Sequence, residues 1–516
     1  MNSGNRMATG WGMASVVVCV ALSGHSFCAG AEKPNVILIY TDDQGYGDMS
    51  ALNPDSRFQT PSLDRLAREG ILFTDAHCSD TVCTPSRYGL LTGRYSWRTT
   101  LKSGVFGAER EGLIADDRMT LASMLSSQGY RTIMVGKWHL GMDFPGDEPT
   151  KKNPDSRDWS QPVRDMPLDK GFETFFGIPA SMNYGVLAWF DGRHASVPPT
   201  QFTKKKPNDR AIADYRIMPP YESSPAPNLM EVAPDFIDSE CLTRFTDRAI
   251  EEVRKSVHGS RQAAPFFLYL PFTSPHKPVI TLPQFQGKSD AGEYGDFMME
   301  TDWHIGRLLD VLDELQLAEN TIVVVTSDNG PENTWKERLK RFGHASNGPF
   351  REGKRSIYEG GHRVPFVMRW PKRVLPGQLT DATICQTDLL ATMADLLDVP
   401  LPDRAGEDSQ SFLPVLLGKD AEHTRVPMIH HSSGGGFAIR DGDWKLILPH
   451  GKQKSELYNI SQDPGEKHDV LDKHPEIVSR LTSAITEIVE NGRSTPGAPQ
   501  KNDTGHWDDL TWIEKN

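Results

Sequence analysis

The chain has 516 residues and a formal net charge of −13, from 56 basic and 69 acidic side chains. Hydrophobic residues make up 37% and there are 44 glycines, a globular composition that excludes a disordered or collagen-like chain. The acidic surplus argues against nucleic acid as a main partner, because duplex binding needs clustered Lys and Arg. Six cysteines are too few for a disulfide framework in a chain of this length.

Residues 1–31 have the features of an export signal. Arg6 precedes an apolar run from Met13 to Leu22, and Ala29-Gly30-Ala31 is a small-x-small cleavage site. The run is too short to cross a bilayer, although an N-terminal anchor, a buried helix or a lipid-modified Cys28 are alternatives. Cleavage would change the net charge from −13 to −14. We expect an exported protein without a membrane span, periplasmic or extracellular and of bacterial type.

Apolar runs alternate with helical patterns over residues 32–422, which we take as the catalytic domain. Four runs are typical of strands buried on both faces of a parallel sheet, at 36–40, 132–135, 266–270 and 322–325. Helical patterns lie between them, for example at 61–69 and 298–315. The alternation predicts a doubly wound α/β sheet, mixed but mostly parallel, with helices on both faces. Ligands of such sheets bind beyond the carboxyl ends of the strands.

Two other regions differ from this pattern. Residues 198–234 contain eight prolines and little periodicity, so we interpret them as a surface excursion, either a functional loop or an inert insertion. Residues 423–516 begin with short strand patterns at 426–430, 436–440 and 444–448, followed by a helical pattern at 475–490. We therefore expect a smaller C-terminal α+β domain with a short antiparallel sheet.

Polar residues follow the predicted strands, where the sheet should gather them into one cleft. Asp42, Asp43, Asp328 and Asn329 form an oxygen-only set, which favours Ca²⁺, or less strongly Mg²⁺, over zinc. An Asp-Asp pair at a strand end can also be a cap or a turn, but two such ends in one sheet favour a metal site. Lys137, His139 and His276 follow strands in the same way, the alternatives being surface lysines and a histidine in a turn.

Cys83 starts the sequence Cys83-Thr84-Pro85-Ser86-Arg87, which precedes an apolar helical pattern. A helix N-terminus offers free backbone N–H groups to an anion. An isolated cysteine is usually a small buried hydrophobic residue, but here Leu91-Thr92-Gly93-Arg94 follows. Together the two motifs resemble the maturation signature of the formylglycine-dependent sulfatases, which have an alkaline-phosphatase-like fold.

The resemblance to this family extends over the chain from about residue 33. The further matching motifs are Pro34-Asn35-Val36, Gly136-Lys137-Trp138-His139-Leu140-Gly141, Ser274-Pro275-His276, Ser327-Asp328-Asn329-Gly330, Gly353-Lys354, residues 359–365, residues 440–446 and residues 456–459. The general pattern is similar to the arylsulfatase A and N-acetylgalactosamine-6-sulfatase branch. Arg355 departs from it, because many relatives have a small residue after the lysine at 354.

The resemblance implies a role for each site residue. Cys83 would be converted to formylglycine by a maturation enzyme, and its hydrate would be the nucleophile and a metal ligand. Arg87 would hold the hydrate, Lys137, Lys354 and Ser181 would contact the sulfate, and Asp42, Asp43, Asp328 and Asn329 would bind Ca²⁺. His276 would protonate the leaving alcohol, and His139 would take the remaining proton of the hydrate.

The sequence thus predicts an enzyme that hydrolyses sulfate monoesters, either of a sulfated saccharide or of an aryl sulfate. A phosphodiesterase or phosphonate monoester hydrolase of the same superfamily is the main alternative. A catalytically silent saccharide-binding relative is a second one, but Cys83 and the four metal ligands are all present. His430 and His431 could approach the sugar or belong to an ordinary turn.

Overall fold

The computed structural model describes Met1 and residues 33–204, 221–226, 229–258, 264–419 and 423–513. The chain divides into two units, Met1–Glu32 and Lys33–Asn516. Apart from Met1, the predicted export signal lies outside the described residues. The fold described below is that of the second unit.

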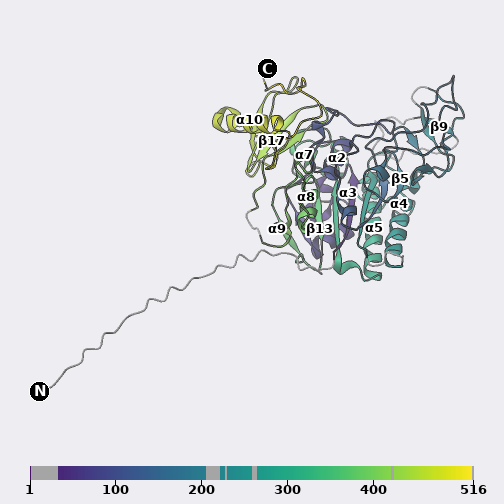
Figure 1. The fold of residues 1–516 in the computed structure, drawn as a ribbon, viewed down its shortest axis with the longest axis horizontal. Coiled ribbons are helices and arrows are strands. Elements are labelled where there is room, and N and C mark those ends of the chain that lie inside the picture. The colour runs from purple at the N-terminus through teal and green to yellow at the C-terminus, as the bar shows by residue number, and fades with distance from the viewer. Residues whose placement is uncertain (2–32, 205–220, 227–228, 259–263, 420–422, 514–516) are drawn as a thin grey trace. The chain divides into compact units, whose positions relative to one another are not determined.

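A ten-stranded sheet forms the centre of this unit, in the order β14-β2-β13-β12-β1-β11-β4-β5-β7-β8 (Figure 1). Strands β12, β1, β11, β4 and β5 are parallel neighbours, whereas β13 and β7 pair antiparallel with β12 and β5. The predicted mixed, mostly parallel sheet is therefore confirmed. The strands are β1 (Asn35–Asp42), β2 (Ile71–Phe73), β4 (Arg131–Lys137), β5 (Thr174–Ile178), β7 (Phe190–Asp191), β8 (His194–Ala195), β11 (Phe266–Pro275), β12 (Thr321–Ser327), β13 (Phe366–Arg369) and β14 (Gln378–Thr380).

Helices cover the sheet in two groups, which explains why its central strands are apolar on both faces. One group packs together as α1 (Pro61–Glu69), α4 (Cys241–His258) and α5 (Gly292–Glu314). The other consists of α2 (Cys83–Thr92), α3 (Leu121–Ser127) and α8 (Asp388–Leu396). Short helices α6 (Trp335–Phe342), α7 (Glu359–His362) and α9 (Leu413–Leu416) lie in the connections. No helix among the described residues is long and apolar enough to cross a membrane.

The proline-rich region contains more regular structure than its sequence predicts. Strands β9 (Gln201–Lys204) and β10 (Leu229–Val232) pair with each other and with β6 (Val186–Leu187) in a three-stranded sheet. Part of the predicted surface excursion at 198–234 thus belongs to a small sheet, which its sequence does not predict. A further pair consists of β3 (Ala76–His77) and β15 (Ile384–Cys385).

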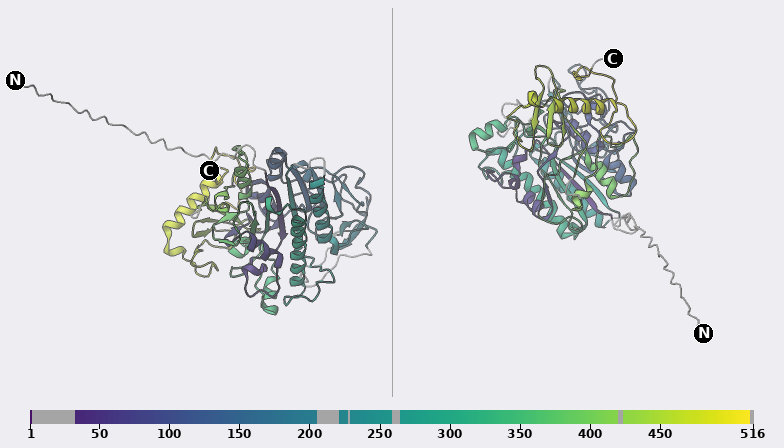
Figure 2. Two further views of the ribbon diagram at one scale, coloured as in Figure 1. Left: turned by 90° about the horizontal axis from the view of Figure 1, so that it is seen from below. Right: turned by 90° about the vertical axis from the view of Figure 1, so that its left-hand side faces the viewer.

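The C-terminal residues form a four-stranded antiparallel sheet against α10 (Pro475–Glu490), shown in yellow in Figure 2. Its strands are β16 (Met428–His431), β17 (Phe437–Asp441), β18 (Trp444–Ile447) and β19 (Glu456–Asn459). Tyr95 and Trp97, which precede this sheet by more than 300 residues in the chain, belong to its hydrophobic core. The sheet therefore packs directly on the larger part of the fold.

Candidate active site

The register of the central strands brings the predicted site residues together. Asp42 ends β1 and pairs with Pro275, the residue before His276, while the preceding Thr41 pairs with Ser327, the residue before Asp328. Lys137 ends β4, which is the other neighbour of β11. Because parallel strands end at one edge of the sheet, the side chains from β1, β4, β11 and β12 meet there.

Asp43 and His139 adopt left-handed backbone conformations directly after their strands, with φ of 67° and 62°. Such φ values are uncommon for residues other than glycine and concentrate at functional sites. The turn at Asp43 points its backbone N–H at Oδ1 of Asp328, 3.1 Å away. It also brings its Oδ1 to 2.8 Å from Nδ2 of Asn329. Hydrogen bonds thus directly link the predicted metal-binding residues that follow β1 to those that follow β12.

Cys83 is the first residue of α2, and only 2% of its surface is exposed. One turn further, the guanidinium of Arg87 donates to Oδ2 of Asp328 at 2.8 Å and to the carbonyl of Lys137 at 3.2 Å. Burial raises the pKa of the Cys83 thiol, so the cysteine itself is not an activated thiolate. Ligand atoms of Asp42, Cys83 and Asp328 lie within 4.8 Å of one another.

The oxygen-only set fits a hard cation. Asp42 Oδ1, Asp43 Oδ2 and Asn329 Oδ1 are buried and have no hydrogen-bond partner among the described residues. Burial and the charge of Asp42 raise the pKa of Asp328, which shows that these carboxylates are crowded. Unpaired buried oxygens are costly, and Ca²⁺ prefers such ligands. The residues therefore suit a calcium ion better than a purely protein-internal network.

Two buried lysines add positive charge at the same place. The ammonium group of Lys137 contacts Asp42, and that of Lys354 contacts Asp43. Although burial favours the neutral amine, the charge of Asp43 raises the pKa of Lys354. Lys354 is thus held as a cation, and the amino groups of both lysines lie where they can bind the oxygens of an anionic group.

The two histidines are held in defined tautomers by backbone carbonyls. His139 Nε2 lies 2.8 Å from the Phe106 oxygen and donates to it, which leaves the buried, unpartnered Nδ1 as a proton acceptor. His276 Nδ1 donates to the Lys277 oxygen at 2.6 Å, and its Nε2 lies 3.8 Å from Asp43 Oδ2. Burial lowers the pKa of His276 to about 4, so a bound anion is needed to keep it protonated near neutral pH.

Ser181 is buried and its hydroxyl has no hydrogen-bond partner among the described residues. It follows β5, the neighbour of β4, but among the described residues no hydrogen bond of its side chain joins it to the site residues above. Tyr184, three residues later, was not predicted; its ring lies 5.5 Å from that of His139. Arg355 pairs with Glu332 at 2.6 and 2.9 Å, so the departure from the family pattern is accommodated by a local partner.

A second cluster of possible metal ligands consists of His77, Glu359, His362 and His430. Lys445 donates from 3.0 Å to both Glu359 Oε1 and His362 Nε2, so its ammonium group supplies the positive charge there. We interpret the cluster as a hydrogen-bonded network. His430 therefore lies in the interior, and His431 is buried against Asp80 at 2.8 Å. An approach of either ring to a sugar is not supported.

Cationic side chains beside buried carboxylates at the strand ends of an α/β sheet are suited to a hydrolase that acts on an anionic ester. The family model described as Sulfatase matches residues 34–399, and the chain belongs to the sulfatase family. It is an arylsulfatase-like enzyme that hydrolyses sulfate esters. A second model, described as N-sulphoglucosamine sulphohydrolase, C-terminal, matches residues 351–491.

Individual relatives match over most of their length. The chain is 34% identical to an N-acetylgalactosamine-6-O-sulfatase of Bacteroides thetaiotaomicron, covering 89% of this chain and 93% of the relative. It is 32% identical to human arylsulfatase A, covering 86% and 84%. A solved structure from work on the metabolism of multiple glycosaminoglycans by Bacteroides thetaiotaomicron is 32% identical and has a TM-score of 0.77, covering 89% and 99%.

Proposed function

We propose that the enzyme removes sulfate from a sulfated saccharide by means of a formylglycine at position 83 and a bound Ca²⁺. One observation carries the proposal: Cys83, two lysines, two histidines and a set of buried side-chain oxygens without hydrogen-bond partners among the described residues lie together at one edge of the sheet. The relative named N-acetylgalactosamine-6-O-sulfatase supports an amino sugar 6-sulfate as the first substrate to test. Export to the periplasm or cell exterior is part of the same proposal and rests on residues 1–31.

In this proposal Asp42, Asp43, Asp328 and Asn329 hold the cation, which offsets charge on the sulfate oxygens. A hydrated formylglycine would supply the oxygen nucleophile. The chain's own residues then orient residue 83 and transfer protons. Arg87, fixed by Asp328, orients residue 83.

Proton transfer is assigned to the two histidines. The ammonium groups of Lys137 and Lys354 bind the sulfate, whose charge also favours protonated His276. Nε2 of His276 gives its proton to the leaving alcohol oxygen. Nδ1 of His139, held as an acceptor by the Phe106 carbonyl, would take the remaining hydroxyl proton of residue 83, so that the bond between its carbon and the sulfate oxygen breaks, sulfate leaves and the aldehyde forms again.

The test compares hydrolysis of 4-nitrocatechol sulfate, N-acetylgalactosamine 6-sulfate and an aryl phosphate diester by purified enzyme with Ca²⁺. Intact-mass analysis of the peptide containing residue 83 reports the modification. We expect sulfate esters to be preferred and the peptide to be lighter than its cysteine form. Preference for the phosphate diester would instead support the phosphodiesterase alternative, and a plain thiol in active enzyme would refute the proposed mechanism.

A further inference from the structure

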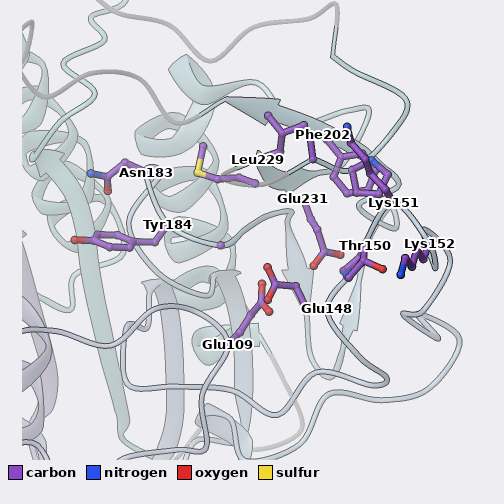
Figure 3. Close-up of a pocket in the computed structure, with 15 residues that line it drawn as sticks. Glu109, Glu148, Thr150, Lys151, Lys152, Asn183, Tyr184, Phe202, Leu229 and Glu231 are labelled. Carbon is purple, nitrogen blue, oxygen red and sulfur yellow. The ribbon is translucent and has the colours of Figure 1, made fainter.

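A cavity of about 710 Å³ begins beside the site just described. Its size falls within the ~300–1,000 Å³ of small-ligand sites. Asn183 and Tyr184 lie at one end, and Tyr184 is the residue whose ring lies 5.5 Å from His139. Figure 3 shows the side chains of Glu109, Glu148 and Glu231 pointing toward one another further along. The cavity therefore extends away from the reacting group, from Tyr184 toward a set of carboxylates.

The interior of the cavity presents hydrogen-bond acceptors that the protein leaves unpaired. Glu231 is 4% exposed and Asn183 3% exposed. Glu231 Oε2 and Asn183 Oδ1 have no hydrogen-bond partner among the described residues, and both residues line the cavity. A buried acceptor without a partner is costly unless a ligand supplies the donor. Two such atoms in different parts of one cavity are independent indications of a ligand.

The charges around the cavity indicate which kind of hydrogen-bond donor a ligand should bring. Arg157 contacts Glu109 Oε2 at 2.6 Å and Glu231 Oε1 at 3.2 Å, so a single guanidinium serves both carboxylates. Glu148 adds a third carboxylate, whereas Lys151 and Lys152 are exposed at the far end. Burial raises the pKa of Glu231 to about 7, which shows that negative charge is already unfavourable there. An anionic ligand group beside Glu231 would increase this cost, whereas hydroxyl donors would relieve it.

Apolar side chains line the cavity as well. They come from Phe202, Leu229 and Met230, together with Pro225 and Ala226. A pyranose combines hydroxyl donors with apolar C–H faces, so it suits a cavity that has both kinds of wall. A flat aryl group would leave the acceptors unpaired.

We propose that this cavity binds an uncharged, hydroxyl-rich sugar residue linked to the sulfated one, and that it disfavours a uronate at that position. The proposal rests on the proposed saccharide sulfatase function and adds a specificity for the neighbouring unit. Glu231 and Asn183 accept hydrogen bonds from its hydroxyls, Phe202 packs on the ring, and Glu148 repels a carboxylate.

The first experiment measures kcat/KM on two disaccharides that carry the same sulfated sugar, one linked to a neutral hexose and one to a uronate. We expect wild type to prefer the neutral disaccharide. Glu148→Gln removes one charge from an exposed position and so weakens the repulsion of the uronate. Glu231→Gln weakens a charge-assisted hydrogen bond to a hydroxyl of the neutral sugar. Each change should lower the preference for the neutral disaccharide roughly tenfold. The matched control is Glu476→Gln, on exposed α10 surface, which should leave the preference unchanged.

A second measurement separates this proposal from the sulfatase proposal. Calorimetry on Cys83→Ala protein measures binding of both disaccharides without turnover. If wild type cleaves no sulfate ester but the Cys83→Ala protein still prefers the neutral disaccharide, the proposed function fails and the cavity assignment stands. Equal binding of the two disaccharides, or a preference unaffected by both glutamate substitutions, overturns the cavity assignment even in an active sulfatase.

Discussion

Cys83 shows how one side chain obtains its chemistry from its position. It begins α2, is almost fully buried, and shares a 4.8 Å neighbourhood with the carboxylates of Asp42 and Asp328. Burial raises its thiol pKa, so the unmodified residue is a poor nucleophile. The same surroundings are suited to an oxygen nucleophile beside cations.

Cys83→Ala should abolish sulfate ester hydrolysis while lowering thermal stability only slightly. The side chain is small and lies at a helix start, so its removal costs little packing. Activity on 4-nitrocatechol sulfate and the melting temperature measure the two effects. Cys241→Ala, a buried cysteine on α4 outside the site, is the control and should remain active. Residual turnover in Cys83→Ala close to wild type would contradict the assigned nucleophile.

Removal of the cation should lower both activity and stability. Asp42 Oδ1, Asp43 Oδ2 and Asn329 Oδ1 have no hydrogen-bond partner among the described residues. An ion that binds them only in the folded state stabilises it by an amount that grows with the logarithm of the ion concentration, about 2.7 kcal/mol at a hundredfold excess over Kd. Chelation should therefore lower the melting temperature by several degrees, and added Ca²⁺ should restore it more effectively than Mg²⁺. In Asn329→Ala the Ca²⁺-dependent shift should shrink; a shift of unchanged size would place the ion elsewhere.

At the scale of elements, one buried ion pair and its neighbouring hydrogen bonds join the segment after α2 to Asp408, to α10 and to the C-terminal residues. Arg98 follows α2 in the chain and donates to both carboxylate oxygens of Asp408 at 2.8 Å. The same guanidinium reaches the Ile488 carbonyl of α10 and the side chain of Asn502. A single side chain thus links segments that are about 400 residues apart.

Asp408→Ala should destabilise the protein by about 3–5 kcal/mol, because it leaves the fully buried Arg98 guanidinium without its carboxylate. Asp403→Ala is the matched control: its side chain is 61% exposed and 3.7 Å from Arg493, so about 0.5 kcal/mol or less is expected. Urea unfolding curves, fitted with the same m-value for both variants, measure the two losses in the free energy of unfolding. Similar losses in the two variants would show that the Arg98 contact contributes little.

At the scale of the whole molecule, the histidine network joins β16 of the C-terminal sheet to strand β3 and helix α7. His77 lies on β3, His362 on α7 and His430 on β16, and the rings of His362 and His430 stack with centroids 3.6 Å apart. Asp75, Arg440, Glu359 and Lys445 surround them. Burial lowers the pKa of all three histidines, so they are neutral in the folded protein.

Stability should fall as the pH decreases below about 6.5, the usual histidine pKa. Below that value the unfolded chain binds protons that the folded chain does not, so the free energy of unfolding decreases with decreasing pH. His430→Phe should flatten this dependence and raise the melting temperature at pH 5, since neither ring nitrogen of His430 has a hydrogen-bond partner in the described part of the chain. Melting temperatures from pH 5 to 8 test this, and an unchanged slope in His430→Phe would contradict it.

Local signals in the sequence predicted the central strands, α10 and the polar residues at the strand ends, because apolar runs and the polar residues that end them are contiguous in the chain. The assignment of Cys83, Arg87 and Lys354 to the site came from the resemblance to a family. The α10 bounds, Pro475–Glu490, coincide with the predicted helix, which starts at a proline. Only the tertiary structure decided features that depend on distant pairing. Strands β9 and β10 exist because they pair with each other and with β6, and Lys354 meets Asp43 across 311 residues. Glu109, Glu148 and Glu231 belong to no common sequence motif. The fold alone brings them into one cavity beside Tyr184, where their like charges repel one another.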